Sequence, residues 1–166
     1  MGNSQPIDLK RKKNISPPEA YVRACRYCAY QERSHKEVRN KLYEYGLFGT
    51  QVEELLTRLI TDGFLNEERF AQAFAGGKFR MKKWGRRKIV RELESHGITP
   101  KCIETGLREI DSKSYSKTLK GLIVKKLTTI QEPNIFRKRD MAARFVIGKG
   151  YEPELVWEII KELTLE

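Results

Sequence analysis

Residues 84–111, WGRRKIVRELESHGITPKCIETGLREID, place two apolar helical stripes on either side of a glycine, and two other stretches repeat the pattern. These are residues 33–60, RSHKEVRNKLYEYGLFGTQVEELLTRLI, and 137–164, RKRDMAARFVIGKGYEPELVWEIIKELT. With Gly46, Gly97 and Gly150 aligned, six further positions are apolar in every copy: Val38, Ile89 and Ala142; Leu42, Leu93 and Val146; Leu47, Ile98 and Tyr151; Val52, Ile103 and Val156; Leu56, Leu107 and Ile160; Leu59, Ile110 and Leu163. Their spacing is helical. The glycines lie 51 and 53 residues apart, which indicates an internal repeat.

Each copy is predicted to form a helix, a glycine turn and a second helix, because glycine readily adopts the left-handed backbone that ends helices. The pairs Ser16–Glu19, Ser34–Glu37 and Thr50–Glu53 fit capping boxes at helix starts. Pro100 and Pro153 suit first helical positions. Another helical segment precedes each pair, over about residues 17–32, 66–82 and 113–129.

These elements predict an all-α fold, an elongated tandem array of three three-helix repeats that resemble helix-turn-helix units. The predicted repeats are residues 15–64, 65–111 and 112–166, and residues 1–14 are predicted to be a flexible basic tail. A unit of about 50 residues buries little surface alone, so neighbouring repeats are expected to pack on one another.

Composition restricts the kinds of protein that this chain can be. The 166 residues are 39% hydrophobic and 33% charged, and no apolar run approaches the ~18 residues that cross a bilayer. The N-terminus lacks the apolar segment of a secretory signal, and three cysteines argue against a disulfide framework. We expect a soluble cytoplasmic protein with no membrane partner, and a monomer, since the repeats can bury their stripes within one chain.

Positive charge is concentrated in parts of the chain. The net charge is +11, of which residues 17–65 contribute nothing and residues 66–111 and 112–166 contribute +4 each. Residues 78–91 contain eight cations and no acid: Lys78, Arg80, Lys82, Lys83, Arg86, Arg87, Lys88 and Arg91. Such clusters attract polyanions, so these eight are the predicted partner- or nucleic-acid-binding residues. A solvated helix face is the alternative interpretation.

Other motifs give no sign of catalysis. Cys25 and Cys28 have metal-ligand spacing, but no second pair completes a site and they are expected to fill a helical core. A nucleophile elbow and a triphosphate-binding loop are both missing from the sequence. We therefore predict a protein that is not an enzyme and has no cofactor or metal. Trp84, at the break before Gly85, has two open roles: stacking on a base or guanidinium, or packing between helices.

Residues 63–98, GFLNEERFAQAFAGGKFRMKKWGRRKIVRELESHGI, resemble the signature region of the RecX regulatory proteins. The shared landmarks are an acidic helix start, Arg-Phe-Ala, a basic stretch that ends in glycine, and later Ile, Glu-Leu and Gly-Ile. In this chain they are Glu67, Glu68, Arg69, Phe70, Ala71, Lys78 to Lys83, Gly85, Ile89, Glu92, Leu93, Gly97 and Ile98. The chain departs from the pattern at Asn66, where the family often has Asp, and at Ala75, Gly76 and Gly77.

The resemblance implies a modular, all-helical regulator that binds the filament of the RecA recombinase on single-stranded DNA. Such regulators hinder ATP hydrolysis, strand exchange and filament growth, and favour filament disassembly. Two alternatives stay open. One is a helical module that binds DNA directly without reading its sequence, and the other is a scaffold that binds acidic peptides.

Overall fold

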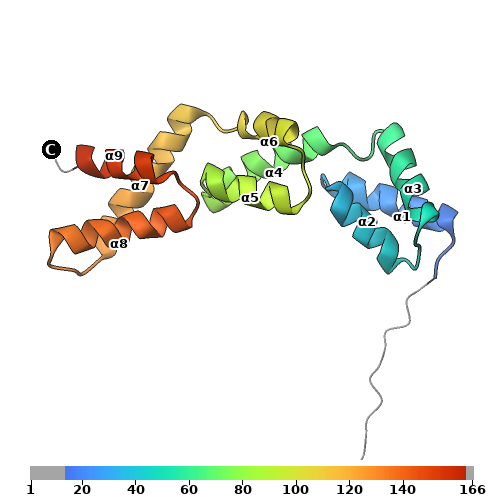
Figure 1. The fold of residues 1–166 in the computed structure, drawn as a ribbon, viewed down its shortest axis with the longest axis horizontal. Helices are drawn as coiled ribbons and strands as arrows, with labels where there is room; N and C mark the ends of the chain where they lie inside the picture. Colours follow the sequence, from blue (N-terminus) through green and yellow to red (C-terminus); the bar gives the residue numbers. More distant parts are fainter. Residues whose placement is uncertain (1–13, 164–166) are drawn as a thin grey trace, which may run out of the picture. The chain divides into compact units, whose positions relative to one another are not determined.

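The computed structural model describes residues 14–163, and this part of the chain is helical without strands (Figure 1). Its helices are α1 (Pro17–Tyr30), α2 (His35–Glu44), α3 (Thr50–Thr61), α4 (Glu67–Lys82), α5 (Arg86–Ser95), α6 (Pro100–Leu107), α7 (Ser112–Thr129), α8 (Ile135–Gly148) and α9 (Pro153–Glu162). The all-α helical array predicted from the repeat is confirmed. Of the predicted basic tail, residues 1–13 lie outside the described range.

The helices belong to two compact units, which divide after Asn66. The first unit contains α1–α3, and the second contains α4–α9. Leu65 and Asn66 belong to the first unit. The rest of the stretch predicted as the second repeat, 65–111, shares the second unit with the predicted third repeat, 112–166, and the boundary between them stays a prediction.

The three aligned glycines form the predicted turns. Gly46, Gly97 and Gly150 have φ of 87°, 75° and 99°, in the left-handed region that follows a helix end. The apolar positions aligned around them are all buried, except Leu107 and Leu163, which pack half-buried against the same core. The repeat detected in the sequence therefore corresponds to a repeated burial pattern.

Most of the predicted helix starts are correct. Ser16 caps α1 by accepting a hydrogen bond from the Glu19 N–H at 3.4 Å, which is one half of the predicted capping box. Ser34 and Glu37 form a complete capping box at α2, with both reciprocal hydrogen bonds present. Pro100 and Pro153 begin α6 and α9 as expected. The predicted Thr50–Glu53 box is wrong, because Gly49 is the residue that precedes α3 and Thr50 is already helical.

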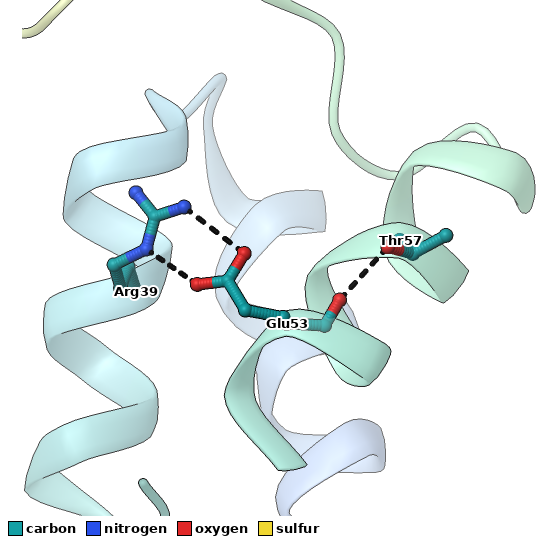
Figure 2. Close-up of polar contacts among 3 residues, drawn as sticks. All are labelled: Arg39, Glu53 and Thr57. Atoms are coloured by element: carbon teal, nitrogen blue, oxygen red, sulfur yellow. Dashed lines mark hydrogen bonds and ion pairs between the residues drawn. The ribbon is translucent and has the colours of Figure 1, made fainter. Parts of the chain in front are cut away.

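Glu53 binds a different partner, which connects α2 to α3 in the first unit. Figure 2 shows the guanidinium of Arg39 facing the Glu53 carboxylate, with Nε–Oε1 and Nη2–Oε2 distances of 3.0 and 3.3 Å. Cys28 is buried in the core of α1–α3, and Cys25 packs against that core. The predicted core role of the two cysteines is confirmed.

A single apolar cluster runs through the second unit and joins α4–α6 to α7–α9. Phe79 of α4 and Tyr151 beyond α8 both stack near Tyr115 of α7, with ring centroids 5.7 and 5.0 Å from it. Near the other end of α4, a Cβ on Gly106 would lie 2.7 Å from the carbonyl oxygen of Ala71, so α4 and α6 approach closely only because α6 has glycine there.

Two turns of the second unit are joined through their backbones. The Gly85 N–H, in the turn between α4 and α5, donates to the Lys149 carbonyl at 2.8 Å. The Arg87 N–H donates to the Gly150 carbonyl at 3.0 Å, and the Tyr151 hydroxyl donates to the Lys83 carbonyl at 3.1 Å. We call this contact of residues 83–87 with residues 149–151 the turn joint.

Glycine is required on both sides of the turn joint. A Cβ on Gly85 would lie 2.2 Å from the carbonyl carbon of Gly150, and a Cβ on Gly150 would lie 2.6 Å from the amide nitrogen of Lys88. The atoms in the way are backbone atoms and, at Gly150, also the Cβ of Lys88, which is fixed to the backbone. None of them can move aside as the far end of a flexible side chain does.

Alanine substitutions should separate this steric requirement from the conformational one. Gly85→Ala should lower the free energy of unfolding by about 3 kcal/mol or more, since the new methyl overlaps backbone. Gly97→Ala meets no atom within 4 Å, so it should cost only the left-handed strain, about 1–2 kcal/mol. Urea unfolding of the two variants measures the difference, and equal losses would contradict the steric role of Gly85.

The Arg39–Glu53 pair should make stability depend on acidity. Hydrogen bonds from Arg39 lower the pKa of the Glu53 carboxyl below its ordinary value. A folded-state pKa below the unfolded one gives stability that is present above the ordinary pKa and is lost as the pH falls through the lowered value. Glu53→Gln should therefore reduce the melting temperature modestly at neutral pH. It should also make the melting temperature decrease less when the pH is lowered.

The exposed neighbour Glu54 provides the matched control, because Glu54→Gln removes the same charge from the same helix. Melting curves recorded between neutral and acidic pH should be changed more by Glu53→Gln than by Glu54→Gln. Identical pH profiles for the two variants would show that the ion pair contributes nothing.

Candidate functional site

The basic segment, residues 78–91, covers the end of α4, the turn to α5 and the first half of α5. Its eight cations do not have equal access to a partner. Three are half-buried, namely Lys78, Arg86 and Lys88. Five are exposed and can meet a partner directly: Arg80, Lys82, Lys83, Arg87 and Arg91.

Two of the half-buried cations lie against Trp84. The Lys88 Nζ lies 4.4 Å from the centre of its ring, and the Lys78 Nζ lies 5.1 Å from it. The ring itself packs against the apolar core of the second unit. Of the two roles open to Trp84, this placement favours packing between helices, with cation–π attraction holding the two ammonium groups at the turn.

Arg86 is held by residues far from it in the sequence. Its guanidinium carbon lies 3.9 Å from the centre of the Tyr115 ring, and its Nη1 lies 3.8 Å from Oε1 of Glu152. Its backbone N–H donates to the Tyr115 hydroxyl at 3.0 Å, and that hydroxyl donates to Glu152 Oε2 at 2.6 Å. The three residues connect the start of α5 to α7 and to the start of α9.

The Tyr115 hydroxyl keeps its proton in this network. Burial and the hydrogen bond to Glu152 raise the pKa of Tyr115 above its ordinary value. Burial likewise raises the pKa of Tyr151 to about 12. Both hydroxyls therefore remain donors near neutral pH, and the contacts of Tyr115 with Glu152 and of Tyr151 with Lys83 persist there.

The structure also shows features that sequence reasoning missed. A pocket of about 590 Å³ opens beside the turn joint, between α5, α6 and α8. Its walls include Val90, Leu107 and Ile147, and its polar lining includes Arg86, Arg87, Arg91 and Glu152. Neither Tyr115 nor Glu152 carries a local motif that would have identified it. The one signal in the sequence was the repeat, which aligns Gly150 with Gly97 and so marked the turn before α9 as structurally important.

Within residues 14–163, His, Cys, Asp and Glu side chains do not gather in groups of three that could hold a metal ion. None of the helices in that range is both long and apolar enough to cross a membrane.

Comparison with known protein families places the chain in a class of proteins built from three-helix domains. Residues 20–59 match the first three-helix domain of RecX, and residues 66–107 match the second. The first match lies on α1–α3 and the second on α4–α6, so each covers three helices of the structure. The chain belongs to the RecX family.

Individual relatives agree with this assignment. The chain is 28% identical to the regulatory protein RecX of Prosthecochloris aestuarii over 145 residues, which are 87% of this chain and 93% of the relative. It is 24% identical to the regulatory protein RecX of Bacillus cereus over 92% of its own length, but it spans only 57% of that relative. The fold is similar to the crystal structure of RecX from Lactobacillus salivarius, with a TM-score of 0.80, 23% identity, and 90% and 97% of the two chains covered.

The two adjacent arginines should behave differently when truncated. Arg86→Ala removes the stacking on Tyr115 and the ion partner of Glu152, so it should destabilise the protein by about 1–2 kcal/mol. Arg87→Ala removes an exposed side chain and should change stability by no more than about 0.5 kcal/mol. Thermal unfolding measures both, and equal stability of the two variants would show that the Tyr115–Glu152 contacts are not stabilising.

Proposed function

We propose that this protein binds the RecA filament on single-stranded DNA and inhibits its ATP hydrolysis, strand exchange and growth. It acts by binding, as a monomer in the cytoplasm, and catalyses no reaction itself. The observation that carries the proposal is the pair of RecX domain matches on α1–α6, together with the exposed cations that the second domain presents.

Charge supports a polyanionic partner. Arg80, Lys82 and Lys83 are exposed at the end of α4, and Arg87 and Arg91 are exposed on α5. A filament with nucleic acid inside it attracts such a surface at long range and orients it on approach.

The repeated architecture supports a polymeric partner. A chain with several three-helix units can contact more than one subunit of a helical polymer, and linked weak contacts strengthen one another without any new chemistry. Inhibition at a low ratio of regulator to recombinase is the expected result of such binding, because one bound molecule affects several neighbouring subunits.

Hydrolysis of ATP by RecA on single-stranded DNA tests the proposal directly. The protein should reduce the steady-state rate when present well below the concentration of RecA. An excess of protein that leaves hydrolysis unchanged would refute the assignment.

A matched pair of variants tests whether the end of α4 is the binding surface. Changing Arg80, Lys82 and Lys83 together to Ala should weaken inhibition about tenfold or more. Changing Lys113, Lys117 and Lys120 of α7 to Ala removes the same charge from exposed positions elsewhere, and should have a smaller effect. Equal effects would show that net charge matters rather than this surface.

Direct, sequence-independent binding to DNA is the second candidate, and the run of cations without an acid in residues 78–91 favours it. Affinity for fluorescent single-stranded DNA, measured without RecA, should then fall steeply with rising salt. If no complex forms even at about 50 mM salt, where phosphate contacts are strong, this candidate is excluded.

A further inference from the structure

We propose that the pocket beside the turn joint binds an acidic peptide segment that carries an apolar side chain. The apolar side chain would enter between Val90, Leu107 and Ile147, and flanking carboxylates would meet Arg87 and Arg91. This inference deepens the proposed function, because it names the chemistry of the partner surface. It rests on the proposed function in one respect, which is the identity of the partner that supplies the peptide.

The pocket is large enough for an apolar side chain together with part of the peptide that flanks it. Its volume is about 590 Å³, within the usual range of sites that enclose a small ligand or a peptide anchor. Val90, Leu107 and Ile147 come from three different helices and are each half-buried while they pack on the core. They form a preformed apolar wall that would bury the anchor without rearrangement of the fold.

The charges around the pocket are only partly balanced within the chain. Arg86 is paired with Glu152, which the Tyr115 hydroxyl also holds in place. Arg87 and Arg91 are exposed, and neither makes an ion pair within residues 14–163. They lie one helical turn apart on α5, where like charges repel each other. A carboxylate placed between them would relieve this repulsion and accept charge-assisted hydrogen bonds.

The aliphatic wall favours a peptide over a nucleic acid. Bases bind most effectively on aromatic rings, where they stack, and the phosphate backbone gains nothing from burial against aliphatic carbon. The pocket lining contains no aromatic side chain. An apolar amino acid flanked by Asp or Glu matches both parts of the site, the aliphatic wall and the two guanidinium groups.

Fluorescence anisotropy with a labelled peptide, Asp-Glu-Asp-Leu-Phe-Asp-Glu-Asp-Glu, tests the inference without RecA or DNA. The peptide should bind the full chain saturably. Replacing Leu-Phe by Ser-Ser, or every acid by its amide, should each weaken binding about tenfold or more, because each change removes one of the two kinds of contact. The assay therefore fails or succeeds independently of the ATP hydrolysis test.

Variants of the protein locate the binding. Arg87→Ala with Arg91→Ala should weaken peptide binding about tenfold, and circular dichroism should show an unchanged fold since both side chains are exposed. Lys113→Ala with Lys117→Ala is the charge-matched control and should bind like the parent protein. Arg91→Glu alone should also abolish most of the binding, because it adds repulsion.

Three results would overturn the inference. The first is no saturable binding of the acidic, apolar peptide. The second is equal binding of the Leu-Phe and Ser-Ser peptides, which would indicate charge attraction alone. The third is a loss of affinity for single-stranded DNA in the Arg87 and Arg91 variant while peptide affinity is unchanged, which would assign these arginines to nucleic acid.

Discussion

The second unit depends on a contact between two backbones. Gly85 and Gly150 approach so closely that neither position has space for a methyl group, and the hydrogen bond from the Gly85 N–H to the Lys149 carbonyl crosses the contact. Because a backbone contact has no side-chain rotamers to vary, it determines the position of α5 relative to α8 tightly. The Arg86–Tyr115–Glu152 network, the packing of Trp84 and the pocket lining are all built next to it.

The cations of the basic segment fall into two groups. Its half-buried members support the structure: Lys78 and Lys88 lie against Trp84, and Arg86 stacks on Tyr115. Its exposed members remain available to a partner on a rigid support. Exposed cations on a backbone that the fold fixes lose less conformational entropy on binding than cations on a mobile segment.

Helical periodicity and glycine placement were enough to predict most of the fold. Gly46, Gly97 and Gly150 marked the turns, since few other residues adopt their backbone conformation, and the aligned apolar residues marked the core. Thr50 misled because Gly49 before it is the N-cap residue, and Thr50 is already the first residue of α3. The separate role of Arg86 was not predictable, because its partners Tyr115 and Glu152 are brought to it only by tertiary packing, and the pocket likewise exists only where α5, α6 and α8 meet.

The pocket and the turn joint share residues, so a molecule bound in the pocket also stabilises the contact between α5 and α8. Gly150 lines the pocket and also accepts the hydrogen bond from Arg87 that helps to close the joint. A molecule that contacts both α5 and α8 binds only while the two helices are together. By mass action, its binding therefore raises the free energy needed to separate them. Linked equilibria are reciprocal. A change that favours separation of α5 from α8 therefore lowers the affinity for that molecule by the same factor by which the bound molecule disfavours the separation.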